Sequence, residues 1–245
     1  MSARVLVTGA LGGLGSAIVD AFAGRGARIA VHHLGQPAQA NERCLELIDR
    51  GVEAKAFEAD VADERSVADL AAAVEEAFGG IDVLVNNAGV MDSAKVIDTD
   101  LQLWRRTMSV DLDGVFLCSK HVLPGMLRRG SGVIVNVSSQ LAFKGARDYA
   151  AYCAAKAGVI GLTRAMAREL GPAIRINAIA PGPVDTEFVA PWATEEWIRE
   201  RTRDSVLGRL AQPHEIAGTV VFLASEDAAL YHGQVLHLNG GGVMA

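Results

Sequence analysis

Three side chains are spaced so that they could handle a proton together. Tyr152 and Lys156 lie four residues apart in a stretch with helical periodicity, and Ser139 ends an apolar run thirteen residues before Tyr152. Positions i and i+4 share one face of a helix, so the phenol and the ammonium should point into the same space. The usual pKa of tyrosine is about 10, and a nearby ammonium favours the phenolate. Lys156 is therefore expected to lower the pKa of Tyr152, while Ser139 donates a hydrogen bond to the oxygen that exchanges a proton with the phenol.

A glycine-rich segment near the N-terminus predicts a phosphate-binding loop. Gly9, Gly13 and Gly15 follow the apolar run 5–7 and precede a helical pattern. Glycine lets the backbone approach a pyrophosphate closely, and the helix N-terminus offers amide donors and a partial positive charge. The spacing departs from the Gly-x-Gly-x-x-Gly order of the common dinucleotide fingerprint, so the strand before it and the helix after it carry the prediction. A dinucleotide beside Tyr152 and Lys156 indicates hydride chemistry.

Short apolar runs alternate with longer segments of helical periodicity along the chain. Seven of these runs are predicted strands, at residues 5–7, 29–31, 54–57, 83–85, 133–137, 174–179 and 235–238. Most lack period-two alternation, which is typical of strands buried on both faces of a parallel sheet. We therefore expect a single domain over residues 1–245, with an α/β Rossmann-type fold, a doubly wound, parallel, seven-stranded sheet and helices on both faces.

Residues 185–210 interrupt this alternation. The segment carries Trp192, Trp197 and many charges, with helical patches but no predicted strand. Long insertions in compact domains often cover a site, so a substrate lid is the favoured interpretation. An ordinary pair of surface helices is the alternative.

Composition narrows the class of protein. The chain has 245 residues, half of them hydrophobic, and its net charge of −6 argues against a basic surface for nucleic acid or anionic lipid. Cys44, Cys118 and Cys153 show no metal-ligand spacing and predict buried free thiols in a reducing compartment. No apolar stretch suits a signal peptide or a membrane span. We expect a cytoplasmic protein that binds a small molecule and no metal.

Six motifs occur in an order that resembles one family. They are Thr8-Gly-x-x-x-Gly-x-Gly15, Asp60-Val61, Asn86-Asn87-Ala88-Gly89, Ser139 with Tyr152-x-x-x-Lys156, Pro181-Gly182-Pro183-Val184-x-Thr186, and Asn239-Gly240-Gly241. From about residue 3 to its C-terminus, the chain resembles the classical short-chain dehydrogenases/reductases (SDR). The resemblance implies strand order 3-2-1-4-5-6-7. It also implies a homotetramer that uses the long helices around Asp111 and Tyr152 and the last strand.

The resemblance further implies a set of NAD(P)-binding residues. It places Asp60 and Val61 around the adenine, residues 87–89 along the ribose, and Val184 with Thr186 at the nicotinamide carboxamide. Lys156 would reach the nicotinamide ribose. The implied cofactor-binding set is Gly9, Leu11, Gly13, Leu14, Gly15, His33, Asp60, Val61, Asn87, Ala88, Gly89, Tyr152, Lys156, Pro181, Gly182, Val184 and Thr186.

The choice between NAD and NADP depends on the end of the second predicted strand. An acidic residue there would bind the ribose 2′-hydroxyl of NAD and repel the phosphate of NADP, but the matching position is His33. The Arg or Lys that NADP-preferring relatives often carry is replaced by Gly12 and Leu34. His32 and His33 could attract a 2′-phosphate if protonated, or could form a solvated strand end. The prediction leans slightly to NADP and leaves dual use open.

One position departs from the family pattern. Relatives usually carry Asn in a stretch resembling Asn-Leu-x-Gly-Val-Phe, where this chain has Asp111-Leu112-Asp113-Gly114-Val115-Phe116. The resemblance makes Asp111 the fourth catalytic residue, acting largely through its main-chain carbonyl. Its carboxylate could also pair with Lys156 and cancel part of the field of that ammonium at Tyr152.

The predicted substrate pocket mixes apolar and polar side chains. Its candidates are Met91, Gln140, Phe143, Tyr149, Phe188 and Trp192. Lys144, Arg147 and Gln140 near its mouth would suit a sugar-like or anionic substrate, or could belong to a solvated loop.

The predicted function is NAD(P)-dependent interconversion of a secondary alcohol and a ketone. Tyr152 would be the acid/base, Lys156 would lower its pKa and Ser139 would polarise the carbonyl. A non-catalytic dinucleotide-binding sensor or scaffold is the alternative from another class, and only the Asp111 departure favours it. An imine or enoyl reductase on the same scaffold ranks last.

Overall fold

A parallel β-sheet organises the chain. The computed structural model describes residues 2–190 and 193–244, and its sheet has seven strands in the order β3-β2-β1-β4-β5-β6-β7. All paired strands run parallel. The strands are β1 Arg4–Val7, β2 Arg28–His33, β3 Ala54–Glu58, β4 Val83–Asn86, β5 Gly132–Val137, β6 Ile174–Pro181 and β7 Val235–Leu238. The predicted fold class and strand order are confirmed.

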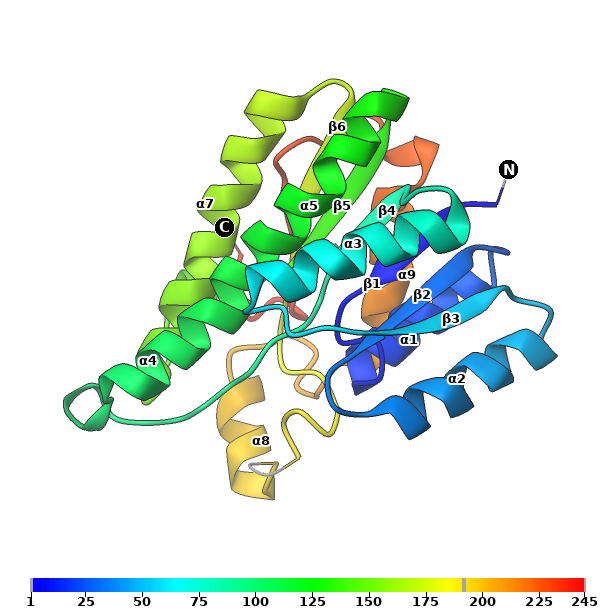
Figure 1. Cartoon of the computed structure of the whole chain (residues 1–245). Helices are drawn as coiled ribbons and strands as arrows, with labels where there is room; N and C mark the ends of the chain where they lie inside the picture. Colours follow the sequence, from blue (N-terminus) through cyan, green and yellow to red (C-terminus); the bar gives the residue numbers. More distant parts are fainter. Residues whose placement is uncertain (1, 191–192, 245) are drawn as a thin grey trace.

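Helices cover both faces of this sheet (Figure 1). Helices α1, α2 and α9 pack on one face, and α3, α5 and α7 pack on the other. The α-helices are α1 Gly13–Ala23, α2 Pro37–Asp49, α3 Glu64–Phe78, α4 Leu101–Met108, α5 Gly114–Arg129, α6 Leu141–Lys144, α7 Ala150–Leu170, α8 Glu195–Thr202 and α9 Pro213–Ala224. Two 3₁₀ turns, η1 Val96–Asp98 and η3 Glu226–Ala228, and one π-helical turn, η2 Ser109–Asp113, complete the described elements.

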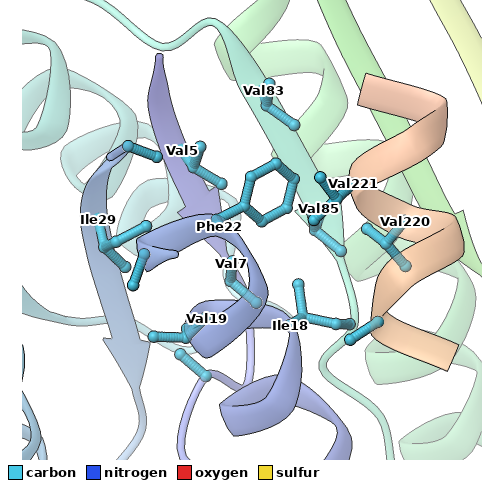
Figure 2. Close-up of a cluster of buried hydrophobic side chains, with 14 of the residues drawn as sticks. Val5, Val7, Ile18, Val19, Phe22, Ile29, Val83, Val85, Val220 and Val221 are labelled. Atoms are coloured by element: carbon cyan, nitrogen blue, oxygen red, sulfur yellow. The ribbon is translucent and has the colours of Figure 1, made fainter. Parts of the chain in front are cut away.

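Alternate residues of the central strands enter two separate cores. Val5 and Val7 of β1 pack with α1 and α9, whereas Leu6 between them packs with the helices of the opposite face. Figure 2 shows the first core, in which Phe22 of α1 lies among valines of β1, β4 and α9. Both faces of these strands are therefore apolar, which explains why the sequence lacks period-two alternation. Each buried Val, Leu or Ile contributes about 1.5–3 kcal/mol to folding.

The ends of β1 and β4 are tied together beside the glycine loop. The Thr8 hydroxyl accepts hydrogen bonds from the backbone N–H groups of Asn87 (2.9 Å) and Ala88 (3.0 Å). The Asn87 side-chain amide donates in return to the carbonyls of Thr8 and Gly9. In doubly wound sheets the ligand crevice opens outside the carboxyl ends of the strands, where the strand order reverses. Here that reversal lies at β1 and β4, so this group of bonds lies at the expected crevice.

Helix α8 stands outside both helical layers (Figure 1). It begins after Thr194, whose hydroxyl accepts a hydrogen bond from the backbone N–H of Trp197. A parallel β-bridge between Val184 and Ala211 joins the residues that flank the 185–210 segment. In the described residues of the segment predicted as a lid, 185–190 and 193–210, α8 is the only helix and no strand is present. Trp192 lies outside the described residues.

Candidate active site

The glycine loop packs so closely that two of its glycines have no room for a side chain. Gly9 adopts a left-handed φ of +62°. A Cβ on Gly15 would lie 2.1 Å from the Gly9 carbonyl oxygen, and one on Gly13 would lie 2.7 Å from the Thr186 methyl carbon. Gly12 is the N-cap of α1 and provides no side-chain cap, and the first turn of the helix holds no acidic residue. The free amides at this helix N-terminus therefore face an approachable backbone, which fits the pyrophosphate of a dinucleotide.

The His32 side chain holds the glycine loop in place through a hydrogen bond. The backbone N–H of Gly9 donates to its Nδ1 (2.9 Å), and its Nε2 lies 3.0 Å from the Ala59 carbonyl. These partners require Nδ1 as acceptor and Nε2–H as donor, which is the neutral tautomer. Burial lowers the pKa of His32 to about 4. Both interpretations of His32 from sequence, a protonated phosphate ligand and a solvated strand end, are therefore wrong, because the ring is buried and its Nδ1 is occupied.

The buried His32 makes stability sensitive to acid. Its pKa is about 4 when folded, against an ordinary 6.5, so the unfolded chain binds the proton first. The His32 contribution is constant above about pH 6.5, falls as pH drops, and levels off below about pH 4. Between pH 7 and pH 5 we expect it to lower the free energy of unfolding by about 2 kcal/mol.

This prediction is tested by urea unfolding of wild type and His32→Asn at both pH values. Asparagine keeps an acceptor for the Gly9 N–H but does not titrate there, so the variant should lose less stability on acidification. His214→Asn, on the exposed first turn of α9, is the matched control. An equal loss in all three proteins would contradict the assignment.

Ser139, Tyr152 and Lys156 come together at one wall of a cavity. All three side chains are buried and line a cavity of about 280 Å³ that also contacts the glycine loop. Lys156 Nζ donates to the Val137 carbonyl (3.1 Å) and lies 5.6 Å from the centre of the Tyr152 ring. The neighbouring Ser138 hydroxyl donates instead to the Lys156 carbonyl (2.8 Å), which ties α7 to the end of β5. The Ser139 oxygen accepts from the Leu141 N–H (3.1 Å).

The protein surroundings raise the pKa of Tyr152, contrary to the expectation from Lys156 alone. Burial is the main cause, and the negative charge of Asp111 acts in the same direction. Interaction with the Ser139 hydroxyl opposes both. The neighbouring ammonium is visible in the sequence, whereas the loss of water around the phenol becomes visible only in the folded chain. At neutral pH, Tyr152 therefore holds its proton.

The Asp111 carboxylate lies next to the Lys156 ammonium. It is fully buried in the π-helical turn η2 and places Oδ1 3.9 Å from Lys156 Nζ. The backbone N–H of Val90 donates to the same oxygen (2.9 Å), whereas Oδ2 has no hydrogen-bond partner in the described chain. Burial raises the pKa of Asp111, and the Lys156 ammonium opposes that rise. The predicted pairing of this carboxylate with Lys156 is thus present in the geometry.

Most of the predicted site residues meet in this one cavity. The members that line it are Gly9, Gly13, Leu14, Gly15, Asn87, Ala88, Gly89, Met91, Ser139, Gln140, Tyr149, Tyr152, Lys156, Pro181, Gly182, Val184, Thr186 and Phe188. These residues lie at the carboxyl ends of β1, β4, β5 and β6 or in the segments that follow them, including the first turn of α1, and α7 supplies the two residues of the Tyr-Lys pair.

Several predicted residues lie elsewhere. Phe143 does not line the cavity, because its ring packs at a tilt against His237 with the ring centres 4.5 Å apart. Leu11 packs against the core. Lys144 pairs with Asp204, and Arg147 is exposed, so neither supplies a charge to the cavity. Cys153 is only half-buried, unlike the two buried cysteines Cys44 and Cys118.

The residues implied for the adenosine half of the cofactor form a separate group beyond the cavity. Asp60 Oδ1 accepts from the Ala62 N–H (2.9 Å), and Val61 is buried against Gly114. His33 is buried at the end of β2, where its Nδ1 accepts from the Gln36 N–H (3.3 Å). It is therefore no solvated strand end either.

Sequence reasoning missed part of the cavity wall. Trp197 and Arg201 of α8 line it, together with Leu141 and Val189. The two α8 residues have i, i+4 spacing, which places them on one helix face. Trp197 was noted only as part of the predicted lid, and nothing local in the sequence distinguishes Arg201 from the other arginines of its helix.

The fold and cavity define a nucleotide-binding α/β protein with a buried Ser-Tyr-Lys group. A family model described as enoyl-(acyl carrier protein) reductase matches residues 9–242. The chain belongs to the short-chain dehydrogenase/reductase family, whose members are NAD(P)-dependent oxidoreductases.

Three relatives match nearly the whole chain. It is 42% identical to cis-4-hydroxycyclohexanecarboxylate dehydrogenase of Sinomonas cyclohexanicum, over 96% of this chain and 94% of the relative. It is 39% identical to a 3-oxoacyl-[acyl-carrier-protein] reductase of Staphylococcus aureus, over 98% of each chain. It is 38% identical to meso-2,3-butanediol dehydrogenase of Serratia marcescens, over 97% of this chain and 93% of the relative.

The described residues lack two kinds of feature. Within 2–190 and 193–244, no helix has both the length and the apolar character needed to cross a bilayer. The same residues contain no group of three or more His, Cys, Asp or Glu side chains placed to hold a metal ion.

Proposed function

We propose that this protein interconverts a secondary alcohol and a ketone with NAD(P). The observation that carries the proposal is that the glycine loop and the group Ser139, Tyr152 and Lys156 line the same cavity. The names of the relatives support an alcohol, diol or oxoacyl substrate. A non-catalytic sensor would have no need for a buried proton donor in that cavity, and no relative named above supports that role.

The site residues divide the work around the reacting oxygen. A bound nicotinamide would supply the hydride in reduction and accept it in oxidation. Tyr152, which holds its proton at neutral pH, donates that proton from Oη to the carbonyl oxygen. Ser139 donates a hydrogen bond to the same oxygen as negative charge develops there. Lys156, held by the Val137 carbonyl, keeps a positive charge near the phenolate that remains.

We propose that both NAD and NADP serve as cofactor. His33 tolerates a 2′-phosphate better than the usual acidic residue would, which supports the slight lean to NADP. Against that lean, Glu58 pairs with His33 in the strand register and its carboxylate accepts from the Gly35 N–H (3.0 Å). Arg43, a nearby cation, is already paired with Asp20 and Glu46. These opposing charges support dual use rather than a strong preference.

The first experiment follows nicotinamide absorbance with NAD(H) and NADP(H) separately against alcohols, sugars, hydroxy acids and ketones. Cis-4-hydroxycyclohexanecarboxylate and meso-2,3-butanediol belong in the panel because relatives carry those names. We expect turnover of at least one secondary alcohol or ketone, with kcat/KM values for the two cofactors within about tenfold of each other. Cofactor binding without turnover of any compound would favour the sensor instead.

Replacing Asp111 with Asn is expected to move the pH profile of alcohol oxidation. The Asp111 charge raises the pKa of Tyr152, and oxidation requires the phenolate. Its removal should therefore shift the rising limb of kcat to lower pH, by about one unit. Asp113→Asn, an exposed change in the same π-helical turn, should leave the limb in place. An unmoved profile in Asp111→Asn would make its side chain a bystander.

We also propose a homotetramer, as in the family resemblance. Large apolar side chains are exposed on the two helices beside η2: Leu101 and Trp104 on α4, and Phe116 and Leu127 on α5. Strand β7 ends the sheet and is only half-buried. Covering these surfaces with further copies of the chain would remove apolar area and an open sheet edge from water.

A further inference from the structure

Arg201 is a cation without an anionic partner in the wall of the cavity. Its guanidinium carbon lies 5.2 Å from the centre of the Tyr149 ring and 5.6 Å from that of Trp197. Among the described residues no carboxylate lies within ion-pair distance of it, whereas Arg203 and Arg209 each pair with an acidic side chain. Cation–π contacts with the two rings hold the guanidinium in place and leave its N–H groups to bind an acceptor.

Two buried donors lie together at this point. Arg201 Nε and Trp197 Nε1 are both shielded from solvent, and neither has a hydrogen-bond partner in the described chain. Native proteins rarely leave such donors unpaired, because the lost hydrogen bonds to water are not replaced. An acceptor that enters the cavity would satisfy both. A carboxylate suits this pair best, since it has two oxygens in the plane that an arginine fork recognises.

The rest of the cavity sets the length of the substrate. Tyr149, whose ring contacts the Arg201 guanidinium, precedes Tyr152 by three residues, which is about one turn, or about 5 Å, along a helix. Met91, Leu141, Phe188 and Val189 contribute apolar surface to the same cavity. The charged and reacting ends of the substrate should therefore be separated by a short hydrocarbon spacer.

We propose that the substrate is a hydroxy acid or oxo acid whose carboxylate binds Arg201 and Trp197 while its carbinol or carbonyl carbon faces Tyr152. This inference rests on the proposed function and specifies its substrate class. The cation is Arg201 of α8 rather than Lys144 or Arg147, the residues that the sequence placed near the mouth of the site.

The test uses oxo acids with three spacers and their uncharged methyl esters: 3-oxobutanoate, 4-oxopentanoate and 4-oxocyclohexanecarboxylate. We expect wild type to prefer at least one acid over its ester. In Arg201→Gln the acid-to-ester ratio of kcat/KM should fall roughly 100-fold for that pair, mainly through the KM of the acid. Arg201→Lys should restore part of the ratio, because it keeps the charge but not the fork.

Arg199→Gln is the matched control. It removes an exposed arginine of the same helix that does not line the cavity, so the ratio should stay at the wild-type value. An equal ratio in wild type and Arg201→Gln, or no acid preferred over its ester, overturns the inference while ester turnover leaves the dehydrogenase function intact.

If neither these acids nor their esters turn over, the broader panel still decides the dehydrogenase function, and binding of the acids decides the inference. Titration calorimetry of the three acids into wild type and Arg201→Gln then provides the test. Binding of an acid that is lost in the variant supports the carboxylate site. Equal binding, or no binding to wild type, overturns it.

Discussion

Tyr152→Phe is expected to lower kcat for alcohol oxidation and ketone reduction roughly 1,000-fold or more. The change removes the hydroxyl that gives and takes the proton, and general acid–base catalysis commonly accounts for 100- to 10,000-fold. The ring itself is buried and packs beside Lys156, so phenylalanine should preserve the packing. The free energy of unfolding and the dissociation constant of NADH, measured by its fluorescence, should therefore change little.

The specificity of this effect is checked with a second tyrosine. Tyr231 packs edge-on against Phe222 and does not line the cavity. Tyr231→Phe should therefore keep wild-type turnover. If Tyr152→Phe retained more than about a tenth of wild-type kcat, another group would have to supply the proton. The assignment of Tyr152 as acid/base would then be wrong.

Gly15→Ala should weaken cofactor binding by about 100-fold and destabilise the fold. The added Cβ would lie 2.1 Å from the Gly9 carbonyl oxygen and 2.8 Å from the Asn87 side-chain nitrogen. Backbone cannot yield as a flexible side chain does, so the loop must move away from β4. Small displacements of a positioned group can cost a factor of about 100, and overpacking of this kind costs about 1–3 kcal/mol.

Gly12→Ala in the same loop separates these two effects from the general cost of losing a glycine. Gly12 has φ of −70°, and its added Cβ would meet only the Gly9 carbonyl oxygen, at 3.7 Å. Its free energy of unfolding should stay within about 0.5 kcal/mol of wild type. NADH titration and urea unfolding of both variants provide the comparison. Equal destabilisation by the two substitutions would mean that the crowding at Gly15 is relieved without cost.

The parts of the molecule that the sequence predicted are those fixed by local pattern. Continuous apolar runs identified the buried strands, and the glycine loop between a strand and a helix indicated where β1 turns into α1. The i, i+4 spacing of Tyr152 and Lys156 placed both on one face of α7, and the motif spacing selected Ser139. These residues do line one cavity, because strands of a parallel sheet end at the same edge.

The remaining features depend on contacts between distant segments. From sequence, His32 was a candidate phosphate ligand, because a sequence does not reveal that the Gly9 N–H donates to its Nδ1. The raised pKa of Tyr152 follows from burial by segments far apart in the chain. Arg201 reaches the cavity wall through its contact with the Tyr149 ring. Phe143 does not line the cavity because its ring packs against His237 of β7.

The bonds between Thr8 and Asn87 also bear on how the protein receives its cofactor. Thr8 is buried, and its oxygens together with the Gly9 carbonyl accept the backbone and side-chain donors of residues 87 and 88. The protein alone makes all of these bonds, so the floor of the crevice is already shaped before a dinucleotide arrives. Binding of a dinucleotide therefore carries little entropic cost from ordering this floor. Little of the attraction between the pyrophosphate and the amides and dipole of α1 is then lost to that cost.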